Sequence, residues 1–231
     1  MSAPSTRWYV SVRSPYSWLA LHDARQERLD LLRESEMRVF FEPEASSGST
    51  ARERSAVFHY TPMSRVKHLY ILRDVARLSR SRGLAVTWPR DPHPRWEISA
   101  LALAAALAQD QDSGKHLAAE LADARWLRGE DVHLEATVAG CLQRCGLDPA
   151  LARLYLSDQG DLLRQTVLAR LDEDGVFGVP LIVVGREPFW GIDRLESAAL
   201  AHSRRTADGI TSVSDDHAAT VPVDDHPGGC G

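Results

Sequence analysis

The sequence contains few cysteines and no long apolar run. Its 231 residues include three cysteines, Cys141, Cys145 and Cys230, an odd number that gives no disulfide framework and is typical of a reducing compartment. No stretch reaches the roughly 18 apolar residues that a membrane span requires, and no charged segment followed by an apolar run of signal-peptide length opens the chain. We therefore expect a cytoplasmic protein that does not enter a membrane.

An excess of one charge is also missing from most of the chain. Five of the 32 acidic side chains follow Arg205, where no Lys or Arg occurs, so residues 1–205 carry 27 acidic and 27 basic groups. Nucleic acid binding requires a clustered basic surface, so we expect no nucleic-acid partner. The segment 206–231 is rich in Ser, Thr, Asp and Gly and poor in large apolar residues, which predicts a disordered acidic tail.

No pattern of metal ligands is present. Cys141 and Cys145 are four residues apart, on one face of a predicted helix, but no His or second Cys pair stands at ligand spacing nearby. Buried packing is the better interpretation of both cysteines. Of the nine histidines, His59 and His68 lie near the expected cleft, where either could act as an acid or a base, although a surface position is the simpler interpretation.

Hydrophobic periodicity predicts an α/β chain with a long helical segment in its middle. Strand, helix, strand, helical insert, strand, strand, helix is the element order of a thioredoxin fold with an enlarged middle. The expected fold class is therefore α/β, a thioredoxin-like fold over residues 1–205 with a large all-helical insertion. The predicted strands are 7–13, 37–42, 181–184 and 187–190, the predicted helices outside the insertion are 15–34 and 193–202, and the insertion covers about 55–172.

Two short motifs stand at the ends of predicted strands. Ser14-Pro15-Tyr16-Ser17 follows the apolar run Trp8–Val12, so a strand passes into a helix whose first amides are unpaired. Gly178-Val179-Pro180 precedes Leu181–Val184, so a proline enters a strand, either at a sheet edge or with a cis bond. In a thioredoxin-type fold these two elements meet and form a thiol-binding site, and we expect a cis Val179–Pro180 bond.

Ser14 is the candidate catalytic residue. A serine hydroxyl at the first turn of a helix can donate a hydrogen bond to a thiolate, and the helix N-terminus adds partial positive charge. Both effects lower the pKa of a thiol from about 8.5 toward neutrality. The structural alternative is a plain N-cap before Pro15 at the first helical position. Ser17, one turn further on, is better interpreted as a packing or surface residue.

These motifs resemble those of the 2-hydroxychromene-2-carboxylate isomerases, which belong with the kappa-class glutathione transferases to the DsbA-like thioredoxin group. The resemblance covers about residues 7–204, and it implies that Ser14 holds the thiolate of glutathione or of another low-molecular-weight thiol. It also implies that Val179 with Pro180 pairs with the thiol peptide. The matching segments are Ser14–Ala20, Gly175–Pro180 and Phe189–Leu195, with Pro62, Lys67 and Tyr70 between them.

The resemblance assigns the two ends of the thiol as well. Ile192 and Asp193 receive the γ-glutamyl end, and Lys67 faces the glycine carboxylate. Asp193 can also be read as the N-cap of the last helix, and an isolated lysine on a helix is usually only solvated. The Asn-x-Pro-Pro segment that family members carry ahead of this lysine is absent, and Ile192 offers only its backbone where the family has a polar side chain.

The substrate pocket is expected beside four aromatic residues. An apolar cleft lined by Tyr16, Phe58, Tyr60 and Trp190 would hold a planar conjugated molecule, although Tyr16 could equally pack on the sheet.

The expected function is the thiol-dependent isomerisation of a conjugated or aromatic small molecule by thiol addition, bond rotation and elimination. A kappa-type glutathione transferase or peroxidase would use the same site, and a non-catalytic scaffold is the alternative from another class. A dithiol oxidoreductase would need cysteine at Ser14 and usually at Ser17. A small-molecule substrate is the expected partner, and a homodimer is compatible with the sequence.

The acidic tail generates a prediction. Deletion of the chain after Arg205 is expected to leave the melting temperature and the activity nearly unchanged, because the removed segment has too little apolar surface to pack on the body. Calorimetry and an activity assay on the truncated and full-length proteins test this, and a large drop in either quantity would show that the tail docks on the body.

Overall fold

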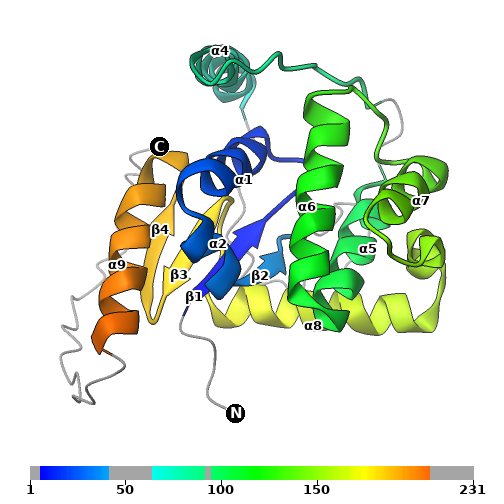
Figure 1. Ribbon diagram of the computed structural model, residues 1–231. Coiled ribbons are helices and arrows are strands. Elements are labelled where there is room, and N and C mark those ends of the chain that lie inside the picture. The colour runs from blue at the N-terminus through cyan, green and yellow to red at the C-terminus, as the bar shows by residue number, and fades with distance from the viewer. Residues whose placement is uncertain (1–5, 42–63, 92–94, 209–231) are drawn as a thin grey trace.

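The computed structural model describes residues 6–41, 64–91 and 95–208 (Figure 1). Its centre is a four-stranded sheet in which the strands are ordered β2-β1-β3-β4. The order and directions agree with the expected thioredoxin-like arrangement, which joins both ends of the chain in one sheet. β1 (Thr6–Val10) runs parallel to β2 (Glu36–Val39) and antiparallel to β3 (Leu181–Val184), which pairs antiparallel with β4 (Glu187–Trp190).

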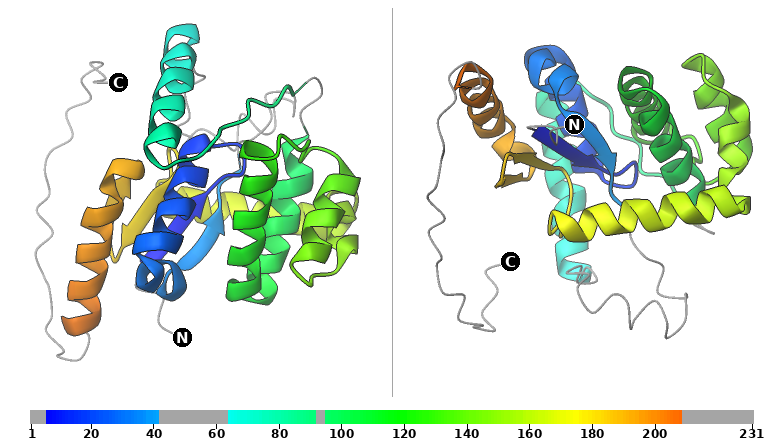
Figure 2. Two further views of the ribbon diagram at one scale, coloured as in Figure 1. Left: turned by 45° about the horizontal axis from the view of Figure 1, so that its top comes forward. Right: turned by 90° about the horizontal axis from the view of Figure 1, so that it is seen from below.

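Helices cover both faces of this sheet (Figure 2). The central strand is therefore apolar on both sides: Trp8, Tyr9 and Val10 are each at most 1% exposed although successive side chains point to opposite faces. One face is covered by α1 (Pro15–Glu27), α2 (Leu29–Glu34) and α9 (Leu195–Asp208), and α8 (Asp158–Glu173) crosses the other.

The chain between β2 and β3 is helical in most of the part that the structure describes. The helix α5 (Trp96–Gln109) is buried nearly all round, because most of its residues are Ala, Leu or Ile. It packs on the neighbouring helices and on β2. The elements of this insertion are α4 (Arg65–Ser81), α5 (Trp96–Gln109), α6 (Gln111–Trp126), α7 (Glu135–Arg144), the 3₁₀ helix η1 (Pro149–Leu156) and α8.

Two tryptophans join the insertion to the sheet-bearing part of the chain. Trp18 of α1 and Trp126 at the end of α6 stack with ring centroids 6.4 Å apart. The Trp126 indole Nε1 donates to the Val12 carbonyl at 3.0 Å, and the Trp18 Nε1 donates to Asp123 at 2.9 Å. The turn that follows β1 is thus tied to the insertion through a buried hydrogen bond.

Several boundaries differ from the sequence-based expectation, and the predicted strand 37–42 is Glu36–Val39. The predicted helix 15–34 is two helices, because Arg28 leaves helical geometry with φ −137° and ψ 48°. The predicted strand 7–13 ends at Val10, where the chain turns toward α1. The last helix continues through Asp208, so residues 206–208 extend α9 and do not belong to the tail.

Among the described residues, no helix is both long enough and apolar enough to cross a membrane.

Candidate functional site

Ser14 lies at the N-cap of α1, directly after the turn that leaves β1. Its amide donates to the Ser11 carbonyl at 3.0 Å, and its Oγ accepts a hydrogen bond from the Ser17 amide at 3.2 Å. Pro15 occupies the first helical turn. Ser17 is buried, and its Oγ accepts from the Ser11 amide at 3.3 Å. The capping role of Ser14 and the packing role of Ser17 are both confirmed.

Ser14 also contacts the second motif. Its hydroxyl donates to the Val179 carbonyl at 3.4 Å, across 165 positions of sequence. The Val179–Pro180 bond is cis, as the sequence predicts. The Ser14 oxygen that caps α1 therefore faces the segment before β3, and the two motifs meet as expected.

The Gly191–Arg194 segment lies next to Pro180. The Gly191 amide donates to the Pro180 carbonyl at 2.9 Å, which pins the start of the 3₁₀ helix η2 (Ile192–Arg194) beside the cis bond. Gly191 has φ +98°, and a Cβ there would lie 2.8 Å from an Asp193 carboxylate oxygen, so the turn requires glycine.

Asp193 lies within η2, so its interpretation as an N-cap is wrong, because Gly191 occupies the cap position. Its side chain is 70% exposed and pairs with Arg194 at 3.3 Å. Ile192 packs its side chain against the core. Asp193 thus presents a carboxylate on a segment that is pinned to Pro180.

Lys67 is exposed on a helix that contacts α1. It is on the first half of α4, where every side chain from Ser64 to Tyr70 is exposed, and α4 projects beyond α1 (Figure 2). Within the described residues, no hydrogen bond or ion pair joins Lys67 to Ser14, Val179 or Asp193. His68 is exposed on the same half of the helix. Phe58, His59 and Tyr60 lie outside the described residues.

Tyr16 packs on α4. Its hydroxyl donates to Asp74 at 2.7 Å, and its ring lies against the core. Burial, followed by the hydrogen bond to Asp74, raises the pKa of Tyr16. Tyr16 therefore joins α1 to α4, a contact that differs from both the pocket and the sheet position expected from the sequence.

Trp190 is 47% exposed at the end of β4. Its ring meets Phe177 edge to face, with centroids 5.1 Å apart, and lies close over Gly178. Trp190 therefore flanks the Val179–Pro180 segment from the side of β4.

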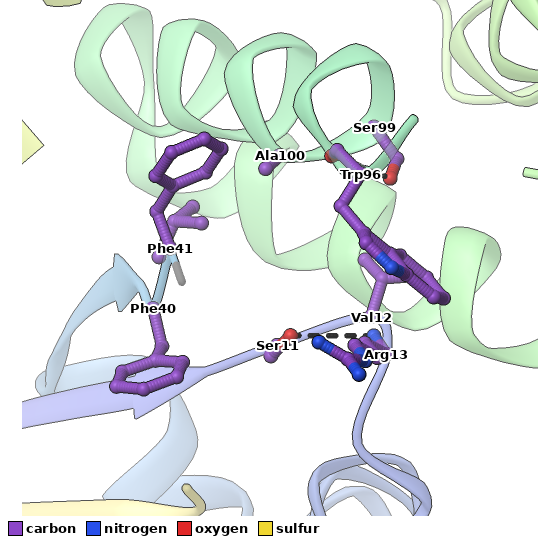
Figure 3. A pocket seen from close by; sticks show the side chains of 9 residues that line it. Ser11, Val12, Arg13, Phe40, Phe41, Trp96, Ser99 and Ala100 are labelled. Carbon is purple, nitrogen blue, oxygen red and sulfur yellow. Dashed lines mark hydrogen bonds between the residues drawn. The ribbon is translucent and has the colours of Figure 1, made fainter. Parts of the chain in front are cut away.

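A small open cavity, with an enclosed volume of about 20 Å³, lies at the carboxyl ends of β1 and β2, next to Ser14 in sequence (Figure 3). Its wall differs from the predicted one: Tyr16 and Trp190 do not line it, because Tyr16 turns to α4 and Trp190 stands on β4. The carboxyl ends of adjacent parallel strands favour a cavity, which is a signal the sequence offered. The lining residues are Ser11, Val12, Arg13, Val39, Phe40, Phe41, Trp96, Ser99 and Ala100.

Trp96 and Phe41 supply the large aromatic surfaces around this cavity, and Arg13 lies at its wall with its guanidinium 5.4 Å from the Trp96 ring centroid (Figure 3). These residues come from three separate segments, the turn after β1, the turn after β2 and the start of α5. The lining therefore combines aromatic surface with one cationic side chain.

The two cysteines in the described part of the chain are not arranged for redox chemistry. Cys141 is buried in α7, and burial raises the pKa of its thiol to about 11. Burial also raises the pKa of Cys145. In the residues that the structure describes, no cluster of three or more His, Cys, Asp or Glu side chains could hold a metal ion.

Comparisons with known proteins agree with the thioredoxin-like fold. The family model of the DSBA-like thioredoxin domain matches residues 7–201. A 2-hydroxychromene-2-carboxylate isomerase of Sphingobium xenophagum is 28% identical over 199 residues, which cover 82% of this chain and 93% of that protein.

Solved structures show the same fold. A 2-hydroxychromene-2-carboxylate isomerase superposes with a TM-score of 0.62 at 22% identity, covering 90% of this chain and 99% of that one. A putative protein disulfide isomerase from Nitrosomonas europaea gives 0.66 at 14% identity with the same coverage. A probable DsbA oxidoreductase from Streptomyces coelicolor gives 0.61 at 16% identity, covering 88% and 90%.

The Tyr16–Asp74 contact generates a prediction. Tyr16→Phe removes a hydrogen bond to a carboxylate between α1 and α4, so it is expected to lower the free energy of unfolding by on the order of 1 kcal/mol and to speed amide exchange in α4 around Val75. Urea titration and hydrogen exchange measure the two effects. Unchanged exchange in α4 would contradict the assignment of Tyr16 to helix docking.

Proposed function

This chain belongs to the DSBA-like thioredoxin domain family, and on that premise we propose that it is a thiol-dependent isomerase of a conjugated small molecule. The observation that carries the proposal is the position of Ser14, whose Oγ lies 3.4 Å from the Val179 carbonyl at the N-terminus of α1. A serine at this position forms no disulfide, so it favours holding a thiolate over exchanging one. The 28% identity to an isomerase over most of the chain supports the same choice.

The residues around Ser14 fit a low-molecular-weight thiol such as glutathione. The Ser14 hydroxyl can donate a hydrogen bond to a sulfur. Its hydrogen bond to the Val179 carbonyl is long, at 3.4 Å, so the hydrogen is available to a better acceptor, while the oxygen still accepts from the Ser17 amide and caps α1. The exposed carboxylate of Asp193 suits an ammonium group, and the Ser14–Val179 and Gly191–Pro180 contacts connect the two residues through Pro180. Lys67, exposed on α4, is the proposed partner of the carboxylate at the other end of the thiol.

A bound thiol would supply a nucleophile that adds reversibly to a conjugated carbon, so that the former double bond can rotate before elimination. The chain itself holds that sulfur in its charged form, through the Ser14 hydroxyl and the positive end of α1.

A glutathione transferase of the kappa type is the second candidate. It would use Ser14, Val179, Pro180 and Asp193 in the same way, and it differs in consuming the thiol. Because both reactions would use the same residues, only the number of thiol molecules consumed per turnover distinguishes the transferase from the isomerase.

Replacement of Ser14 tests the site. Ser14→Ala is expected to reduce turnover by on the order of ten- to a thousandfold, as for the loss of one preorganised donor, and to raise the pKa of the bound thiol. It also removes an N-cap, at a cost of about 1 kcal/mol in the free energy of unfolding.

Ser157→Ala is the matched control, because Ser157 caps α8 through the Gly160 amide in the same way and lies away from the cavity. The control is expected to lose similar stability and to keep full turnover. Equal turnover in Ser14→Ala and the wild-type protein would reject the role of Ser14, whereas a wild-type protein without turnover would favour a non-catalytic scaffold.

The amount of thiol required distinguishes the two reactions. For an isomerase, dialysed enzyme is expected to be inactive or slow, and sub-stoichiometric glutathione restores full conversion of a conjugated substrate to a product of unchanged mass. Chromatography with mass detection follows both quantities. Conversion that stops when the glutathione is exhausted, with a product heavier by one thiol, would favour the transferase, and turnover without thiol would reject both.

A further inference from the structure

The helix α4 concentrates positive charge that the chain as a whole does not show. Between Arg65 and Ser81 it contains five basic side chains and one acidic one, so its net charge is +4, whereas residues 1–205 are balanced. The acidic residue, Asp74, accepts from Tyr16 and pairs with Arg77. The remaining basic side chains are exposed and have no ion-pair partner in the described part of the chain: Arg65, Lys67, Arg73 and Arg80.

Arginines on the neighbouring helices are used differently. Arg128 and Arg144 each pair with both Glu120 and Glu130, which forms a network between α6 and α7. Such a network neutralises the local charge. The unpaired basic side chains of α4 have no comparable acidic partner among the described residues, so this helix keeps its positive charge.

One face of α4 combines this charge with apolar surface. A spacing of three or four residues places side chains on one side of a helix, and the outward face of α4 consists of Val66, Leu69, Tyr70, Arg73, Arg77 and Arg80. Val75 and Ser79 lie on the opposite side and are buried. Val66, Leu69 and Tyr70 are 79%, 45% and 59% exposed. The outward face is therefore apolar in the first two turns and cationic in the turns that follow.

The apolar part of the outward face projects away from the rest of the molecule. Every side chain from Ser64 to Tyr70 is exposed, and α4 stands beyond α1 in Figure 2. Removing such a group of large apolar side chains from water is favourable. The outward face thus fits a partner that offers both apolar contact and negative charge.

A bilayer that contains anionic lipids offers both. Basic side chains bind its acidic headgroups, while aliphatic and aromatic side chains enter the boundary between the headgroups and the acyl chains. Nucleic acid offers the negative charge without an apolar layer. A second copy of this chain, in a symmetric contact between two α4 helices, would place one cationic face against another, which repulsion opposes.

We propose that the outward face of α4 attaches the protein reversibly to an anionic bilayer surface. Its apolar end enters the interfacial layer, and Arg73 and Arg80 lie at the headgroups. The helix rests on the bilayer and does not span it. This inference goes beyond the proposed function and does not use the proposed reaction.

The attachment leaves the thiol site open. Lys67 precedes Asp74 by seven residues, which is about two turns, so the two share the side of α4 that contacts Tyr16 of α1. Tyr16 is two residues after Ser14. The attached helix is therefore joined directly to the segment that carries the site, beside a phase into which apolar conjugated molecules partition.

The experiment titrates the intact protein with phosphatidylcholine vesicles that contain phosphatidylglycerol, and it measures the bound fraction by flotation. We expect the protein to float with these vesicles and to stay behind with phosphatidylcholine alone. Arg73→Gln with Arg80→Gln is expected to weaken binding by about 10- to 30-fold, because each basic side chain near an anionic surface contributes about fivefold. Val66→Ser with Leu69→Ser is expected to weaken it by about tenfold.

Matched controls remove the same chemistry elsewhere. Arg186→Gln with Arg204→Gln removes two exposed arginines that also have no ion-pair partner among the described residues. They come from the β3–β4 turn and from the last part of α9, which lies away from α4 in Figures 1 and 2. Leu162→Ser with Leu200→Ser removes two leucines that are 65% and 52% exposed. Both control proteins are expected to bind the vesicles within about twofold of the wild-type protein.

A wild-type protein that does not float with the anionic vesicles would overturn the inference, and so would control variants that lose as much binding as the α4 variants. Binding of double-stranded DNA that is as tight, and that Val66→Ser with Leu69→Ser leaves unchanged, would assign α4 to nucleic acid instead. A dimer that this variant dissociates, without vesicle binding, would assign it to a second copy. Thiol-dependent turnover enters none of these measurements, so the proposed function and this inference can fail separately.

Discussion

The hydrogen bond from the Trp126 indole to the Val12 carbonyl is the contact on which the site depends. Val12 lies in the turn between β1 and α1, and its carbonyl is buried where water does not reach it. A buried carbonyl without a partner costs about 1–3 kcal/mol, so the turn takes the conformation that meets the indole. Because Trp126 ends α6, the helical insertion determines where Ser11, Arg13 and Ser14 stand.

The Ser14 hydroxyl has two roles, because it accepts one hydrogen bond and donates another. A serine oxygen has two lone pairs and one hydrogen. One lone pair accepts from the Ser17 amide and caps α1, while the hydrogen is directed toward Val179. The cap therefore orients the hydroxyl that the proposed reaction uses, and the structural and functional interpretations of this serine are compatible.

The sequence by itself determined the order of the elements, the cap at Ser14, the cis bond before Pro180 and the meeting of these two motifs. Each depends on local signals, such as strand periodicity, a serine before a proline, or a Gly-Val-Pro step, together with a fold whose strand order is shared by a family. Only the tertiary structure decided that Trp96, Arg13 and Phe41 come together and that Tyr16 bonds Asp74. The physical reason is that these contacts depend on how the insertion packs on the sheet, over separations that no local pattern encodes.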